Sequence, residues 1–122
     1  MPLTDNVFPC TIAVDAMGSD GAPDIEVQGV IDALAELNEP TPYLKIKLVG
    51  NRDQLTPLVD KYSQRSGTQP TNSLEIVHAS DVIEMTDHPA KAARRKLDAS
   101  MNVAASLVKI GQADAMISAG NS

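Results

Sequence analysis

Aromatic residues and cysteine are both scarce in this chain of 122 residues. Phe8, Tyr43 and Tyr62 are its aromatic residues, tryptophan is absent, and Cys10 is its one cysteine. So few aromatic rings predict an aliphatic core and argue against the stacking platforms that bind single-stranded nucleic acid. One cysteine excludes an intrachain disulfide and a multi-cysteine metal site, and fits a protein of the reducing cytoplasm.

The chain also has few positively charged residues and no long apolar run. Ten Lys and Arg residues stand against 16 Asp and Glu residues, which gives a formal net charge of −6 at pH 7. An acidic chain argues against binding nucleic acid or an anionic membrane. No run approaches the roughly 20 apolar residues that span a bilayer, and the first ten residues lack the features of a signal peptide. Any membrane contact is therefore expected to be peripheral.

What is present is an alternation of strand-like and helix-like segments. We expect strands at 11–15, 44–49, 74–78 and 113–118, and helices at 24–37, 53–63, 100–110 and from near Pro89. This alternation predicts an α/β fold with a mainly parallel sheet. Residues 1–10 are expected to form a tail. Residues 11–122 are expected to form the N-terminal part of one α/β domain, truncated after a strand that normally needs a covering helix.

Two of the helices carry apolar residues at the spacing of one buried face. In the helix at 24–37 these residues are Val27, Val30, Ile31 and Leu34. In the helix at 100–110 they are Met101, Ala104, Ala105 and Val108. Gly111 fits the position just after the end of that second helix.

The first stretch that could carry chemistry is the loop at 15–23, Asp-Ala-Met-Gly-Ser-Asp-Gly-Ala-Pro. Its glycines, Gly18 and Gly21, match neither a dinucleotide fingerprint nor a Walker loop. A loop that leads into a helix offers free N–H groups to an anion, but Asp15 and Asp20 would require a compensating cation there. A tight turn capped by Asp20 and a ligand site remain two alternatives.

The second stretch is Lys-Ala-Ala-Arg-Arg-Lys at 91–96, which holds four of the ten basic residues. On a helix, Lys91, Arg94 and Arg95 share one face. Such a face could bind phosphate or an acidic partner protein, and the alternative is a solvated helix surface.

The third stretch is Ser-Ala-Gly-Asn-Ser at 118–122, at the carboxyl end of a predicted strand. Small residues let the backbone approach a ligand closely, and Asn121 could donate to an oxyanion or to phosphate. An ordinary turn is the alternative. His78 and His88 lack the spacing of metal ligands, so no metal site is predicted.

In this order, the three stretches resemble the start of bacterial phosphate acyltransferase, the PlsX family. The segment Glu-Ile-Val-His-Ala-Ser-Asp-Val-Ile-Glu-Met at 75–85 adds to the resemblance, which runs from about residue 11 to residue 122. It implies a three-layer α/β/α fold related to isocitrate and isopropylmalate dehydrogenases, of which this chain would be an incomplete first part.

The resemblance implies an acyltransferase that moves a fatty acyl group from acyl carrier protein to inorganic phosphate. The product is an acyl phosphate for phospholipid synthesis, and no metal or organic cofactor is implied. It further implies a cytoplasmic homodimer, in peripheral contact with the membrane, that passes its product to a membrane glycerol-3-phosphate acyltransferase. A non-catalytic α/β segment that binds phosphate or carrier protein without turnover is the alternative. A nucleotide-binding oxidoreductase comes third, because its fingerprint is missing.

The motif positions of the family imply roles for individual residues. Lys91, Arg94 and Lys96 would recognise phosphate or the carrier protein. Asn121 is the candidate donor to the oxyanion, and no general base is assigned. The other residues implied to bind substrate or shape its pocket are Asp15, Gly18, Asp20, Gly21, Ser100 and Gly120.

This chain departs from the family pattern at three places. Ser19 stands where the family has a second glycine, and would be strained if that position needs a positive φ. Ala99 replaces a serine before Ser100, and Ser122 replaces a threonine.

Overall fold

The computed structural model describes residues 10–37, 43–67, 73–79 and 100–119. Within them the elements run in the order β1 (Cys10–Asp15), α1 (Asp24–Leu37), β2 (Leu44–Gly50), α2 (Arg52–Ser66), β3 (Leu74–His78), α4 (Ser100–Lys109) and β4 (Ala115–Ser118). The helix expected from near Pro89 lies outside the described residues. No helix in the described segments has both the length and the apolar composition needed to cross a bilayer.

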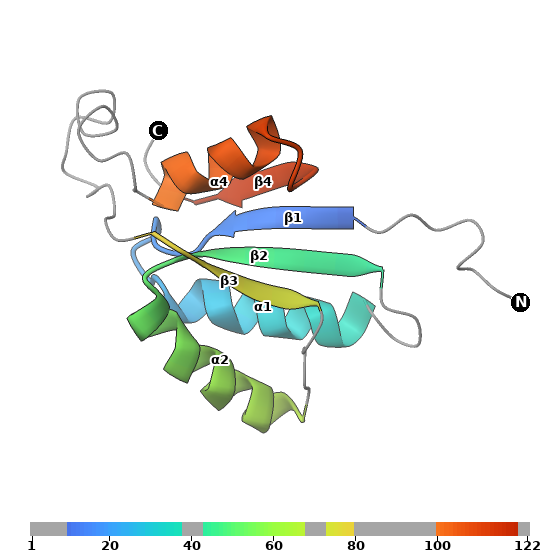
Figure 1. Ribbon diagram of the computed structural model, residues 1–122. Coiled ribbons are helices and arrows are strands. Elements are labelled where there is room, and N and C mark those ends of the chain that lie inside the picture. Colours follow the sequence, from blue (N-terminus) through green and yellow to red (C-terminus); the bar gives the residue numbers. More distant parts are fainter. Residues whose placement is uncertain (1–9, 38–42, 68–72, 80–99, 120–122) are drawn as a thin grey trace, which may run out of the picture.

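The four strands form one parallel sheet with the order β3-β2-β1-β4. Helices α1 and α2 cover one face of the sheet and α4 covers the other (Figure 1). This arrangement confirms the predicted α/β fold with a parallel sheet, and it is consistent with three layers.

Apolar side chains fill both interfaces between helices and sheet. On the α1 side, the core includes Leu48 and Leu55 together with the predicted face of α1, Val27, Val30, Ile31 and Leu34. On the α4 side, the core is smaller and made largely of alanine and valine, with Ala13 and Val49 from the sheet and Ala104 from the helix. Small residues there let α4 lie close to the sheet.

The expected inner face of α4 was wrong at one position. Ala105 is exposed, whereas Ser100, Ala104 and Leu107 are buried. Because residues 104 and 105 are both alanine, apolar spacing alone does not determine how α4 is rotated about its own axis. The buried hydrogen bond of Ser100 to Asp15 fixes the rotation, because it turns the row that contains Ser100, Ala104 and Leu107 toward the sheet.

Strand boundaries differ from the expectation by one or two residues. Strand β1 begins at Cys10, because the Cys10 N–H donates to the Tyr43 carbonyl. Strand β4 begins at Ala115 and not at residue 113. Just before it, Asp114 makes a reciprocal pair with Thr11, in which each backbone N–H donates to an oxygen of the other residue.

The strand order reverses direction at β1. From β1 the chain moves outward through β2 to β3, and β4 then pairs on the opposite side of β1. Parallel α/β sheets bind ligands at such a reversal, outside the carboxyl ends of the strands. The described helices also begin at this end of the sheet (Figure 1). The fold therefore predicts a ligand site at the carboxyl ends of β1 and β4, where Asp15 and Ser118 are paired in register.

Gly29 gives a test of the helix α1 that is independent of any site. It lies exposed in the middle of the helix, and a Cβ added there would meet nothing within 4 Å. We expect Gly29→Ala to raise the free energy of unfolding by about 0.5–1 kcal/mol, because alanine loses less backbone entropy on entering a helix. Urea denaturation of the full-length gene product measures this change, and a loss of stability would contradict the position of Gly29 in the helix.

Candidate active site at the carboxyl ends of β1 and β4

Asp15 is the centre of the hydrogen-bond network at this edge. Its side chain is buried, with 1% of the residue exposed. The Ser100 Oγ donates to Oδ1 at 2.5 Å and the Ser118 Oγ donates to Oδ2 at 2.7 Å. The Met17 backbone N–H also donates to Oδ1, at 3.1 Å. One carboxylate therefore joins the end of β1, the following loop, the start of α4 and the end of β4.

The chemistry of this network limits what its members can do next. A serine hydroxyl has a single proton to donate, and both hydroxyls direct that proton to Asp15. In this arrangement neither Ser100 nor Ser118 has a proton left to donate to a ligand. Hydrogen bonds to a charged oxygen are short and strong, which offsets part of the cost of burying the carboxylate.

The loop at 16–23 uses part of its backbone to begin α1. The Ile25 N–H donates to the Gly21 carbonyl and the Val27 N–H donates to the Pro23 carbonyl. Two of the first four N–H groups of the helix are therefore bonded within the chain, which leaves less of this terminus for an anion. The backbone of the loop thus turns into α1, while the side chain of Asp15 reaches the neighbouring elements. The cap by Asp20 stays a prediction.

The other predicted residues of this loop differ in burial. Gly18 is buried, Asp20 is exposed, and the space beside Gly21 is taken by the side chain of Ile25. No non-glycine residue in the described segments has a positive φ, so Ser19 is not strained in the way that its replacement of a glycine suggested.

Several predicted site residues lie outside the described residues. These are Lys91, Arg94, Lys96, Gly120 and Asn121. Their roles stay predictions. In the sequence, the basic stretch precedes Ser100, and Gly120 and Asn121 follow Ser118. These two serines are the residues whose hydroxyls donate to Asp15.

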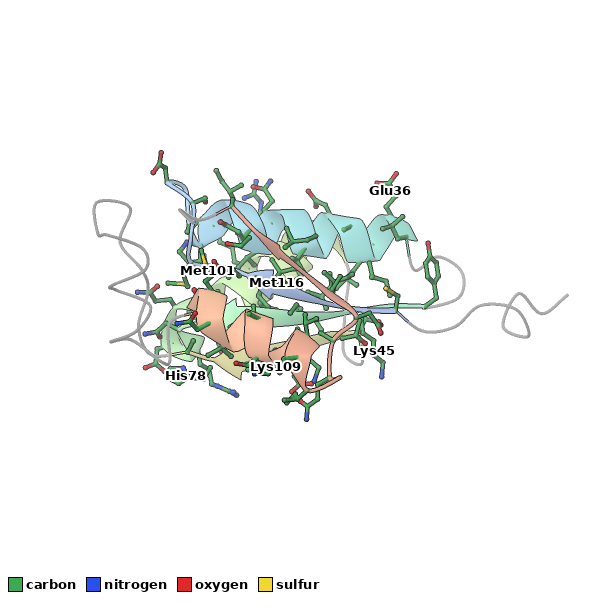
Figure 2. All side chains as sticks on the ribbon, turned by 90° about the horizontal axis from the view of Figure 1, so that it is seen from above. Glu36, Lys45, His78, Met101, Lys109 and Met116 are labelled. Carbon is green, nitrogen blue, oxygen red and sulfur yellow. The ribbon has the colours of Figure 1, made fainter. Side chains whose placement is uncertain are left out.

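The neighbouring helix N-terminus, that of α2, is closed by its own chain. The Asn51 side chain accepts from the N–H groups of Asp53 and Gln54. The Arg52 N–H donates to Nδ1 of His78, the last residue of β3. His78 lies toward the end of the sheet where the strands finish, as does Met101 of α4 (Figure 2). These contacts make α2 a poor anion site.

Sequence reasoning missed both of these capping residues and also the role of Ser118. Asparagine directly before a helical segment is a recognisable signal for a cap, so Asn51 could have been found. Nothing local marks His78 or Ser118, because each acts on a residue that is distant in the sequence, Arg52 and Asp15 respectively.

We expect Asn51→Ala to lower the free energy of unfolding by about 1 kcal/mol, because two N–H groups of α2 lose their acceptor. Urea denaturation of the full-length gene product measures the change. Asn51→Asp keeps the acceptor and is the control that should retain stability. Equal loss in both variants would show that the cap does not act through its side-chain oxygen.

The opposite edge of the sheet, where the amino ends of β1, β2 and β3 lie, has a weaker candidate site. A shallow cavity of about 170 Å³ lies there, with Lys45, Lys47 and Glu75 among its lining residues. The Lys47 ammonium is already paired with the Glu75 carboxylate at 3.2 Å. Ligands of parallel sheets bind at the carboxyl ends of strands, so we place the candidate site at Asp15 and not here. Among the described residues no group of three His, Cys, Asp or Glu side chains could hold a metal ion.

The chain as a whole is similar to known proteins. Residues 10–122 match the model of a family described as fatty acid synthesis protein. Phosphate acyltransferase of Methylococcus capsulatus is 45% identical over 111 residues, which are 91% of this chain and 30% of the relative. Phosphate acyltransferase of Exiguobacterium sibiricum is 47% identical over 110 residues, with 90% and 30% covered. The chain thus spans about 30% of the length of these relatives.

Proposed function

This chain belongs to the fatty acid synthesis protein family, and from that premise we propose that the whole protein is a phosphate acyltransferase. It would transfer a fatty acyl group from acyl carrier protein to inorganic phosphate and release acyl phosphate for phospholipid synthesis. The names of its relatives support this reaction. The observation in the structure that carries the proposal is the place of the Asp15 network, at the reversal of strand order where parallel α/β sheets bind ligands.

The reaction makes definite demands on such a site. A phosphate oxygen forms a bond to the thioester carbonyl carbon, the carbon–sulfur bond then breaks, and the carrier thiolate leaves. The site must hold an anion close to the carbonyl and must donate hydrogen bonds to the oxyanion that forms. Phosphate is already anionic at neutral pH, so the attack requires no strong base.

The buried part of the edge does not meet these demands by itself. Asp15 repels an anion, and the protons of Ser100 and Ser118 are directed toward Asp15. We therefore keep the basic stretch, with Lys91, Arg94 and Lys96, as the proposed phosphate-binding group. Gly120 and Asn121 remain the proposed donors to the oxyanion.

The setting of the reaction is part of the same proposal. The protein would act in the cytoplasm as a homodimer, with peripheral membrane contact. Its product, an acyl phosphate, would be consumed by a membrane glycerol-3-phosphate acyltransferase. A segment that binds phosphate or carrier protein without turnover is the alternative.

Acyl phosphate formation tests the proposed reaction directly. The full-length gene product is incubated with palmitoyl acyl carrier protein and phosphate, and the product is trapped with hydroxylamine as the hydroxamate. We expect hydroxamate that depends on both phosphate and enzyme. Binding of both substrates without any hydroxamate would favour the non-catalytic alternative, and binding of NADH would favour an oxidoreductase.

The basic stretch gives a second test. We expect Lys91→Ala and Arg94→Ala each to raise the phosphate KM about tenfold, because each removes a cation that pairs with the anion. Steady-state kinetics with phosphate as the varied substrate measure this. Lys45→Ala, at the opposite edge of the sheet, is the control of equal charge. A phosphate KM unchanged in both site variants would reject the assignment.

A further inference from the structure

We propose that Asp15 is a positioning residue of the acyl-transfer site, which acts through Ser118 and does not contact substrate. The inference rests on the proposed function, and it assigns a different role from pocket lining to a residue at the centre of the site. The geometry that carries it is the contact of both carboxylate oxygens with donors from different elements.

Burial and bonding leave Asp15 little capacity for a ligand. The residue is 1% exposed, and Oδ1 already accepts two hydrogen bonds while Oδ2 accepts one. Its donors in the described part of the chain are two hydroxyls and an amide, with no cation among them. A phosphate beside this carboxylate would meet charge repulsion that no cation bonded to Asp15 in the described residues compensates. Asp15 can therefore influence the reaction only through the groups that it holds.

Strand β4 depends on such contacts for its position. It is four residues long, and its neighbour in the described sheet is β1. An aspartate fixes the pair of strands at each end. At the amino end, the Asp114 Oδ2 accepts from the Thr11 N–H at 2.8 Å. At the carboxyl end, Asp15 holds Ser118, which in the sequence directly precedes the small residues 119–122.

Helix α4 is held by the same carboxylate. Ser100 is the first residue of the helix, is 2% exposed, and directs its hydroxyl to Oδ1. Because Oδ1 and Oδ2 belong to one rigid group, the start of α4 and the end of β4 are fixed relative to each other. Positioning contributes to catalysis by holding the reacting groups within a fraction of an ångström of their productive geometry.

The test uses the full-length gene product and separates kcat from KM. The variants are Asp15→Asn, Ser118→Ala and Ser118→Thr, with Asp114→Asn as the matched control at the other end of the same strands. Asparagine keeps the shape of Asp15 and one acceptor oxygen, so this variant is expected to fold. Ser118→Ala leaves the carboxylate and its other two bonds in place, so it provides a milder disturbance.

We expect Asp15→Asn and Ser118→Ala each to lower kcat about tenfold with the phosphate KM changed less than about twofold. Ser118→Thr keeps the hydroxyl and should restore most of kcat. Adding Asp15→Asn to Ser118→Ala should cost less than it does alone, because both changes disturb the same contact between residues 15 and 118. Asp114→Asn should leave kcat unchanged.

Two results would overturn the proposal. A raised phosphate KM with unchanged kcat in Asp15→Asn would make Asp15 a binding residue, and full kcat in Ser118→Ala would remove the route through Ser118.

Amide hydrogen exchange separates this failure from failure of the proposed function. If the unaltered protein makes no acyl phosphate, the function fails. Exchange at 115–119 that is about tenfold faster in Asp15→Asn would still establish that Asp15 fixes β4, and unchanged exchange would refute it.

Discussion

Asp15→Ala is expected to lower the free energy of unfolding by about 4 kcal/mol, because it leaves one buried donor and two part-buried donors without their acceptor. The donors are the hydroxyls of Ser100 and Ser118 and the N–H of Met17. Ser100 is itself buried, so water cannot replace the lost acceptor there without opening the interface between α4 and the sheet. The loss is therefore larger than that of a single exposed hydrogen bond.

Urea denaturation of the full-length gene product, followed by circular dichroism, measures this loss. Asp20→Ala is the control, because Asp20 lies in the same loop but is exposed, and we expect it to change stability by less than about 0.5 kcal/mol. Asp15→Asn should fall between the two, since the amide keeps one acceptor and can donate to a rotated hydroxyl. A loss below about 1 kcal/mol in Asp15→Ala would mean that the network contributes little to the fold.

The local elements could be predicted from the sequence because their signals are local. The limits of α1 and β3 were predicted to the residue, since the apolar spacing of α1 and the apolar run of β3 are bounded by polar segments. Gly111 was placed correctly after α4, where its φ of 83° is one that glycine adopts freely.

The site could not be predicted in the same way, because it depends on strand order. Alternation of strands and helices indicates a parallel sheet, but it does not say on which side of β1 the strand β4 pairs. That choice brings Asp15 and Ser118 together across 103 residues of sequence. The loop and the end of β4 were each recognised separately as candidate stretches, yet the contact between Asp15 and Ser118 was visible only once β4 lay beside β1.

The backbone and the first side chain of the loop at 15–23 make different contacts. Its backbone carbonyls accept from Ile25 and Val27 and so begin α1, as a structural turn does. Its first side chain, that of Asp15, organises the adjoining elements of the candidate site. Met17 lies between these two parts, and its N–H donates to Asp15, so we expect a change in the packing of the Met17 side chain to reach Asp15.

Gly50→Ala tests that link, and we expect it to lower the free energy of unfolding by about 2 kcal/mol and to reduce kcat. Gly50 is buried at the end of β2, and an added Cβ would lie 2.7 Å from Met17 Cγ, 2.9 Å from Met17 Sδ and 3.2 Å from Leu55 Cδ1. Leu55 is fully buried, so the Met17 side chain must move. The Met17 N–H is one of the donors to Asp15.

Gly29→Ala is the matched control, because the same substitution at an open helical position should stabilise the protein. Met17→Ala shortens the side chain that an alanine at position 50 would strike. In that background the effect of Gly50→Ala should shrink to the remaining close approach to Leu55. Urea midpoints and kcat of the four combinations at positions 17 and 50 measure the coupling. Additive effects would contradict a contact between Gly50 and Met17. If Met17→Ala instead relieves the loss of stability and of kcat caused by Gly50→Ala, a residue remote from the reacting atoms acts on the site through the packing of this loop.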